Sequence, residues 1–242
     1  MNGTGFDFRD RTVLVTGVGR AGQIGHAVAT AFGQAGARLV LADVNAVGVA
    51  ERAREFESQG VSARAAAGDL TDPDVAGFAV ALAVKEFGRL DAVINVAGGL
   101  TTYGPIASLT PKDVDRELAI NLKTTFAVSQ AAIDALATSR GCIVNISSVA
   151  YFQPSGQMTV YSAAKAAVAG FTRALAAELK ERGVRVNAVA PAMVRTPENV
   201  KSAGPDAQYV ELSELTASIL FLASPQASAL TGHILPVTGF PV

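Results

Sequence analysis

Short apolar runs alternate with longer segments of helical character along the whole chain. The first run, Thr12–Thr16, ends at Gly17, and the segment Ile24–Ala35 that follows is closed by Gly36. Runs of this kind are typical of buried strands, and the segments between them are typical of helices. The strands that we predict are Thr12–Thr16, Ala37–Val44, Ser62–Asp69, Leu90–Val96, Gly141–Ser147, Val184–Ala190 and Ile234–Val237.

Helix start and stop signals separate these strands. Asp72 before Pro73, and Thr110 before Pro111, each combine a capping residue with proline at the first helical position. We predict helices over Ile24–Ala35, Val47–Ser58, Asp72 to Gly88, a long segment from Thr110, Thr159–Lys180 and Ser213–Ala223.

The alternation predicts an α/β fold. Strand–helix–strand units connect parallel strands through right-handed crossovers, so we expect one doubly wound domain over residues 1–242. Its parallel sheet should hold about seven strands, with helices on both faces. Ligands bind beyond the carboxyl ends of the strands in such sheets. The notable residues at predicted strand ends are Gly17, Asp43, Asp69, Asn95, Ser148 and Pro191.

A glycine-rich turn follows the first strand. The run from Gly17 to Gly25 opens a helix, as a backbone that approaches a pyrophosphate requires. Asp43 ends the second strand, where a carboxylate can accept hydrogen bonds from ribose hydroxyls and repel a 2′-phosphate. Arg20 in the turn favours the opposite, because a cation could bind a 2′-phosphate. We therefore expect NAD as the cofactor, with NADP as the alternative.

Tyr161 and Lys165 lie four residues apart in an alanine-rich predicted helix, so they share one face. A phenol has a pKa of about 10, and a nearby cation lowers the pKa toward neutrality. The pair could therefore exchange a proton with an alcohol or a carbonyl oxygen. On its own, the same spacing more often indicates a packed ring beside a lysine that reaches solvent.

Composition narrows the choice of function. Half of the residues are hydrophobic and the net charge is −1, which gives no electrostatic basis for binding nucleic acid or an anionic membrane. No apolar stretch is long enough to span a bilayer, and residues 1–11 lack a signal-peptide pattern. Cys142 is the lone cysteine, which favours the cytoplasm, and with His26 and His233 it makes no recognisable metal site. No G-x-S-x-G motif is present, which argues against an α/β-hydrolase.

Taken together, the motifs resemble those of the short-chain dehydrogenase/reductase family over nearly the whole chain, and the resemblance implies a Rossmann fold. The glycine turn is similar to T-G-x-x-x-G-x-G, Asn95-Val96-Ala97-Gly98 to N-N-A-G, and Pro191 to Thr196 to P-G-x-x-x-T. Tyr161 and Lys165 match Y-x-x-x-K, and Ser148 precedes the tyrosine by 13 residues, the usual family spacing.

The resemblance implies an NAD(P)-dependent oxidoreductase that interconverts a secondary alcohol and a ketone. The catalytic set that it implies is Asn121, Ser148, Tyr161 and Lys165. The cofactor-binding residues that we expect are Gly17, Gly19, Arg20, Gln23, Ile24, Asp43, Asp69, Leu70, Asn95, Ala97, Gly98, Tyr161, Lys165, Pro191, Val194 and Thr196. The family is commonly tetrameric, so a homo-oligomer is expected as well.

The sequence departs from the family pattern at several places: Val96 replaces the second Asn of N-N-A-G, Ala192 replaces a glycine, and Pro236-Val237-Thr238-Gly239-Phe240 differs from V-D-G-G. Two further departures concern length. The outer glycines, Gly17 and Gly25, are eight residues apart instead of six, and Pro197 to Leu212 is short for a substrate lid. The apolar tail 240–242 of a neighbouring subunit could complete that lid. We expect a largely apolar small-molecule substrate. The substrate contacts that we expect are Tyr103, Tyr151, Gln153, Met158 and Met193.

Three functions remain open from the sequence. A catabolic NAD-dependent dehydrogenase is favoured by Asp43. An NADPH-dependent 3-oxoacyl-thioester reductase is the first alternative. A catalytically silent nucleotide-sensing scaffold is the second, and the complete catalytic set argues against it.

Overall fold

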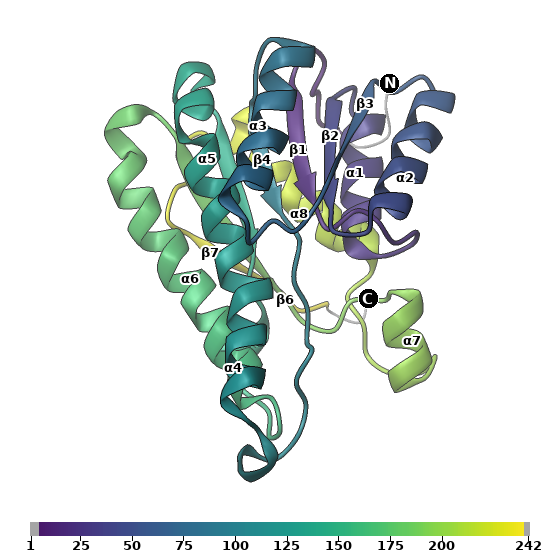
Figure 1. Cartoon of the computed structure of the whole chain (residues 1–242), viewed down its shortest axis with the longest axis vertical. Coiled ribbons are helices and arrows are strands. Elements are labelled where there is room, and N and C mark those ends of the chain that lie inside the picture. Colours follow the sequence, from purple (N-terminus) through teal and green to yellow (C-terminus); the bar gives the residue numbers. More distant parts are fainter. Residues whose placement is uncertain (1–4, 240–242) are drawn as a thin grey trace.

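Seven parallel strands form one sheet in the order β3-β2-β1-β4-β5-β6-β7 (Figure 1). The computed structural model describes residues 5–239. The sheet order reverses between β1 and β4, and the carboxyl ends of the strands face the bottom of Figure 1. The strands are β1 (Thr12–Thr16), β2 (Arg38–Asp43), β3 (Ala63–Ala67), β4 (Ala92–Asn95), β5 (Cys142–Ile146), β6 (Arg185–Pro191) and β7 (Ile234–Val237).

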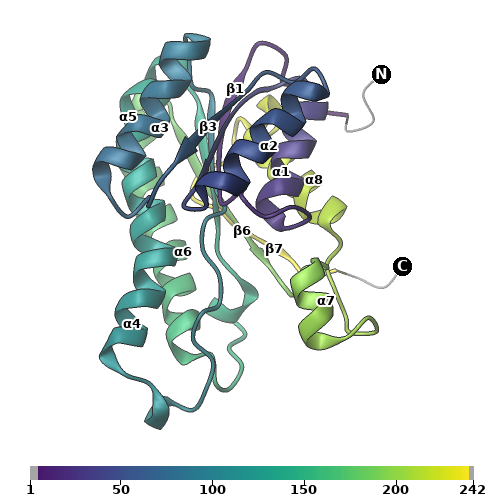
Figure 2. The same ribbon diagram turned by 45° about the vertical axis from the view of Figure 1, so that its right-hand side comes forward.

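Helices cover both faces of this sheet (Figures 1 and 2). One face packs against α1 (Ile24–Gln34), α2 (Ala46–Ser58) and α8 (Leu212–Ala223). The other packs against α3 (Pro73–Phe87), α5 (Thr124–Ser139) and α6 (Thr159–Leu179). The predicted doubly wound α/β architecture is confirmed.

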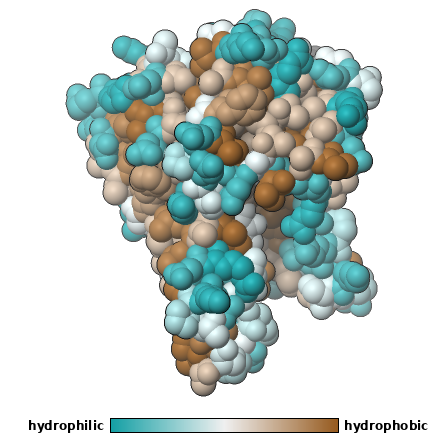
Figure 3. Space-filling view, in the orientation of Figure 1, coloured by the Kyte–Doolittle hydropathy of each residue, from teal (hydrophilic) through white to brown (hydrophobic). Residues whose placement is uncertain are grey.

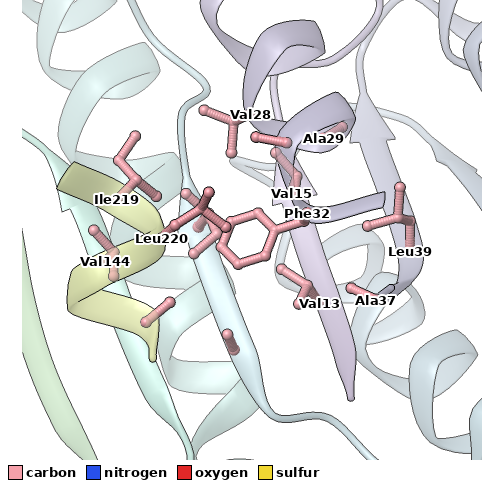
Figure 4. Close-up of a cluster of buried hydrophobic side chains, with 14 of the residues drawn as sticks. Val13, Val15, Val28, Ala29, Phe32, Ala37, Leu39, Val144, Ile219 and Leu220 are labelled. Atoms are coloured by element: carbon pink, nitrogen blue, oxygen red, sulfur yellow. The ribbon is translucent and has the colours of Figure 1, made fainter. Parts of the chain in front are cut away.

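The alternation of side chains along β1 divides the core between the two faces. Val13 and Val15 point to the face with α1 and α8, whereas Leu14 points to the face with α3 and α5. Phe32 of α1 fills the space over β1 (Figure 4) and meets Phe8 edge-to-face, with ring centroids 4.8 Å apart. Both rings are fully buried, so this packing fixes the last turn of α1 against the sheet.

Two elements differ from the sequence-based expectation. The long helix from Thr110 is interrupted, because α4 (Pro111–Leu118) passes into a π-helical segment at Ala119–Lys123 before α5 begins. The segment that we expected to be only a short lid contains a helix, α7 (Pro197–Ala203). The Thr196 side chain caps α7 and Pro197 occupies its first turn, a start signal that the sequence analysis missed.

Cys142 lies at the start of β5 and is 2% exposed. Burial raises the pKa of its thiol, so it packs as a small hydrophobic residue. Within residues 5–239, no helix combines the length and apolar character that a membrane crossing needs.

Candidate active site

A cavity of about 480 Å³ lies beyond the carboxyl ends of β1, β2 and β4. This is the place where a doubly wound sheet binds its ligand. The predicted residues that line it are Gly17, Arg20, Gln23, Ile24, Asp43, Asp69, Leu70, Ala97 and Gly98. The lining residues outside the predicted set are Gly25, Val44, Gly68, Thr71, Val96, Arg116, Ala119, Ile120 and Thr124.

The glycine turn is closely packed against the start of α1. A Cβ atom at Gly25 would lie 2.1 Å from the carbonyl oxygen of Gly17, so only glycine fits there. Gly19 is buried against Asp43, and its Cβ would lie 2.8 Å from the carboxyl carbon. Gly19 therefore shapes the loop, and it is not among the described residues that line the cavity.

Asp43 joins the glycine turn to the end of β2. One carboxylate oxygen accepts the Gly19 amide at 2.8 Å, and the other accepts the Asn45 amide at 2.8 Å. A carboxylate has about four lone-pair sites, so acceptor capacity remains for a ligand hydroxyl. Arg20 also lines the cavity, and its guanidinium pairs with Glu198 of α7 at 2.7 Å.

Asn95 was predicted to bind the cofactor, but its side chain is buried inside the protein. Its side chain is 3% exposed and donates to Asn145 Oδ1 at 2.9 Å and Ser129 Oγ at 3.1 Å. Among the described residues that line the cavity, Asn95 does not occur. The neighbouring turn is held by Thr16, whose hydroxyl oxygen accepts the backbone amides of Val96 and Ala97.

The four predicted catalytic residues come from three elements that meet at the carboxyl edge. Ser148 follows β5, Tyr161 and Lys165 lie on α6, and Asn121 lies in the π-helical segment. π-Helical turns are rare and often occur at functional sites, since they redirect one side chain within a helix. The Asn121 amide donates to the carbonyl oxygen of Gly99 at 2.9 Å, and its side-chain oxygen accepts the Gly99 amide at 3.0 Å.

Neighbouring serines at the end of β5 have separate contacts. The Ser147 hydroxyl donates to the backbone carbonyl of Lys165 at 2.9 Å, so it anchors α6 to the sheet. Ser148 instead interacts with the Tyr161 phenol, and this hydrogen bond lowers the phenol pKa. The geometry agrees with the choice of Ser148 over Ser147 as the candidate catalytic serine.

Burial dominates the electrostatics of the tyrosine–lysine pair. Desolvation raises the pKa of Tyr161; Ser148 lowers it and Glu117 raises it. Burial lowers the pKa of Lys165 to about 8, and the charge of Glu117 acts in the opposite direction. The Lys165 ammonium lies 5.7 Å from the centre of the Tyr161 ring and donates to the carbonyl of Ile146 at 3.0 Å. The Tyr161 pKa is therefore raised in this structure, opposite to the expected direction, because loss of water outweighs the hydrogen bond with Ser148.

Glu117 is the site residue that the sequence analysis did not identify. Its side chain is fully buried, and a carboxylate oxygen accepts the Asn121 side-chain amide at 3.1 Å. The other oxygen accepts the backbone amide of Thr101 at 3.1 Å and the Thr101 hydroxyl at 2.5 Å.

The predicted nicotinamide segment runs from the end of β6 into α7. Pro191 is the last residue of β6, and Val194 is 2% exposed and forms a bridge to Val210. The Thr196 hydroxyl oxygen accepts the Asn199 amide at 3.2 Å as the cap of α7. Within the described chain, none of these residues lines the 480 Å³ cavity.

A second cavity, of about 620 Å³, lies between the turn after β5 and the start of the α7 segment. Figure 3 shows the surface hollowed between the column formed by α4 and the lobe formed by α7. Of the predicted substrate contacts, Gln153 and Met193 line this cavity. The other lining residues are Val149, Ala192, Gln208, Thr238 and Gly239.

The remaining substrate candidates lie elsewhere among the described residues. Tyr103 is 65% exposed, and Tyr151 packs edge-to-face on Phe152 with ring centroids 4.8 Å apart. Met158 immediately precedes α6 and is absent from the described lining of the second cavity. The tail 240–242 lies outside the described residues.

Comparison with known proteins matches the short chain dehydrogenase family model to residues 11–206. The chain is 34% identical over 242 residues to the (2S)-[(R)-hydroxy(phenyl)methyl]succinyl-CoA dehydrogenase subunit BbsD of Thauera aromatica, covering 96% of each chain. It is 35% identical to the D-threitol dehydrogenase of Mycolicibacterium smegmatis, covering 97% of this chain and 94% of that protein. The structure of a 7α-hydroxysteroid dehydrogenase, complexed with NADH and 7-oxo glycochenodeoxycholic acid, superposes with a TM-score of 0.90 at 28% identity. That comparison covers 100% of this chain and 98% of the other.

The chain belongs to the short-chain dehydrogenase/reductase family. It is an NAD(P)-dependent oxidoreductase that acts on CH–OH groups and uses a nicotinamide cofactor. The family prediction and the enzyme prediction are both confirmed.

Proposed function

We propose that this protein is an NAD-dependent dehydrogenase that oxidises a secondary alcohol on a largely apolar substrate, in a catabolic role. The observation that carries the proposal is the convergence of Ser148, Tyr161, Lys165 and Asn121 from three elements at the carboxyl edge of one sheet. Ile120, next to Asn121, lines the first cavity, and Val149, next to Ser148, lines the second, so the two cavities lie on either side of this set.

The residues of the first cavity fit a dinucleotide. The close approach at Gly25 brings the backbone turn to the start of α1, where amide groups can bind a pyrophosphate. Asp43 would accept ribose hydroxyls, and Asp69 with Leu70 would border the adenine. Lys165 would hold the nicotinamide ribose, while Val194 and Thr196 would hold the carboxamide. The bound nicotinamide supplies the hydride acceptor.

The protein's own side chains would handle the proton. The Ser148 hydroxyl would bind the substrate oxygen, and Tyr161 would take the alcohol proton. Asn121 would hold a water molecule on the path by which that proton leaves. Burial raises the pKa of Tyr161, so the phenol loses its proton only in alkaline solution. Oxidation needs the phenolate as base, and it is therefore expected to run faster as the pH rises.

Two contacts support NAD over NADP. Asp43 presents a carboxylate to the ribose side of the cavity, where a 2′-phosphate would meet negative charge. The Arg20 guanidinium pairs with Glu198 at 2.7 Å and is directed toward α7 instead of Asp43.

The second cavity supports a small, largely apolar substrate that also carries polar groups. Met193, Val149 and Ala192 supply apolar contacts, and Gln153 with Gln208 supplies amide groups. The relatives named above act on a phenyl-substituted hydroxyacyl-CoA, a polyol and a steroid, so the shared chemistry is the secondary alcohol.

We further propose a homo-oligomer in the cytoplasm. An apolar groove on α4, the π-helical segment, α5 and α6 is suited to a second copy of the chain, and the residues that line it include Leu118, Leu122, Phe126 and Phe171. The buried, unpaired thiol of Cys142 fits a reducing compartment.

The test is turnover by the purified protein. Nicotinamide absorbance is followed with a panel of secondary alcohols and ketones, with NAD and NADP in parallel. We expect turnover that prefers NAD, and a loss of about 10²-fold or more in Tyr161→Phe with cofactor binding retained. Near-normal turnover in Tyr161→Phe would refute the assigned proton transfer, and a preference for NADP would refute the role of Asp43.

A further inference from the structure

Glu117 of α4 is a charged side chain buried where the reaction site meets the loop after β4. It is 0% exposed, whereas the exposed Arg116 beside it reaches Asp113 at 3.2 Å and the Thr101 carbonyl at 3.4 Å. Burying an isolated carboxylate is costly unless hydrogen bonds and an opposite charge compensate it. The contacts of Glu117 therefore require an explanation.

All of its hydrogen bonds are accepted ones. The Glu117 carboxylate accepts the Thr101 amide, the Thr101 hydroxyl and the Asn121 side-chain amide. Asn121 in turn exchanges hydrogen bonds with Gly99. These bonds join one carboxylate to the candidate catalytic asparagine and, through Gly99 and Thr101, to the loop after β4.

The compensating charge comes from α6, which packs against α4. Lys165 is 4% exposed and its ammonium interacts electrostatically with Glu117, as does the Tyr161 phenol. Three other titratable groups on neighbouring segments have different surroundings. Tyr103 of the loop is 65% exposed, Lys123 of the π-helical segment lines the apolar groove, and Tyr151 packs on Phe152. The site therefore buries one negative and one positive side chain together.

We propose that Glu117 is a positioning residue of the reaction site: its carboxylate fixes the Asn121 amide and the Gly99–Thr101 loop, and its negative charge compensates the buried positive charge of Lys165. This inference rests on the proposed function of Asn121 and Lys165. According to this inference, the reaction requires the negative charge of the Glu117 side chain as well as its shape.

The first test measures the charge of Lys165 directly. Lysine side chains labelled at Cε are titrated by NMR, and the Lys165 signal is assigned by its absence from Lys165→Met. The midpoint in the unmodified protein is expected near pH 8. Glu117→Gln keeps the shape but removes the charge, and should lower this midpoint by about one pH unit. Glu117→Asp keeps the charge, so the pH midpoint of Lys165 in this variant should stay close to that of the unmodified protein.

The direction of the shift separates a specific effect from a structural one. A variant that merely loosened the site would expose Lys165 and raise its midpoint toward the ordinary value of 10.5. Glu178→Gln is the matched control, because it removes an exposed carboxylate from the same helix as Lys165. An unchanged or raised midpoint in Glu117→Gln, or an equal drop in Glu178→Gln, overturns the proposal.

The second test measures turnover. Glu117→Gln should lower kcat about tenfold or more with little change in the KM for the cofactor, because Gln presents an amide donor to either Thr101 or Asn121. Turnover that is lost in Tyr161→Phe but unchanged in Glu117→Gln overturns this inference and leaves the proposed function standing. If the unmodified protein shows no turnover, the proposed function fails while the lysine titration still decides the role of Glu117.

Discussion

Replacing Gly25 by alanine tests how the glycine turn is built. Gly25 is the second residue of α1, where alanine would ordinarily improve helix stability by about 0.5–1 kcal/mol. Here the added Cβ would lie 2.1 Å from the Gly17 carbonyl oxygen and 2.6 Å from its carbonyl carbon. Both are backbone atoms, so no side chain can rotate away to make room.

The cost follows from the displacement that the substitution demands. Real Cβ contacts under 3.0 Å are essentially never found, so α1 and the turn must separate by about 1 Å in a buried segment. Overpacking of this kind costs about 1–3 kcal/mol, and the helical preference of alanine offsets only part of it. We expect Gly25→Ala to lower the free energy of unfolding by about 1–2 kcal/mol, or the Tm by about 2–8 °C for a protein of this size.

The matched control is Gly77→Ala in α3. No atom lies within 4 Å of the Cβ that this change would add, so the same substitution should raise the Tm by about 1–4 °C. Thermal unfolding gives the stabilities, and calorimetric titration with NAD gives the affinity. Gly25→Ala should bind NAD about tenfold or more weakly, because the displaced turn borders the cofactor cavity. A Gly25→Ala protein with unchanged Tm and unchanged NAD affinity would refute the close approach.

Asp43 and Lys165 give two further predictions, and Tyr161 gives a third. Asp43→Asn should move the NAD-to-NADP ratio of kcat/KM toward NADP by about 10- to 100-fold, corresponding to the 1.5–3 kcal/mol of a charged hydrogen bond, measured by steady-state kinetics. The folded-state pKa of Lys165, about 8, lies below its ordinary value of 10.5, so its burial penalty is largest below pH 8 and disappears above pH 10.5. Urea unfolding should therefore show the protein gaining about 3 kcal/mol relative to Lys165→Met between these limits, and no relative gain would contradict the burial. The rate of alcohol oxidation should rise between pH 7 and pH 9, since the Tyr161 pKa is raised, and a flat pH–rate profile would count against phenolate as the base.

Much of the fold could be predicted because its signals are local. The strand Thr12–Thr16 is apolar at its three central positions, and Thr110 forms with Asp113 the capping box that begins α4. The π-helical segment could not be predicted in this way. The residues of Ala119–Lys123 continue the helical sequence pattern of α4 and α5, so the sequence does not distinguish them. The π-helical turn becomes apparent only in the structure, where Asn121 contacts Gly99.

The candidate site was predictable as a set of residues and less so as an electrostatic environment. Glu117 directly follows two exposed charged residues, Asp115 and Arg116, and such a run usually indicates a solvated helix face. Its burial results from the loop after β4, which folds over it. In the same way, spacing places Tyr161 beside Lys165, but the direction of the Tyr161 pKa depends on desolvation by segments distant in the sequence.

The two departures from the family pattern that concern length meet in space. The lengthened glycine turn reaches α7, where Arg20 pairs with Glu198 and Gly22 faces the ring of Pro197. The exposed Arg20–Glu198 ion pair contributes little stability, so what matters is that it brings the glycine turn next to α7. The segments Gly17–Gly25 and Pro197–Leu212, which both differ in length from the family pattern, are therefore in contact with each other beside the cofactor cavity.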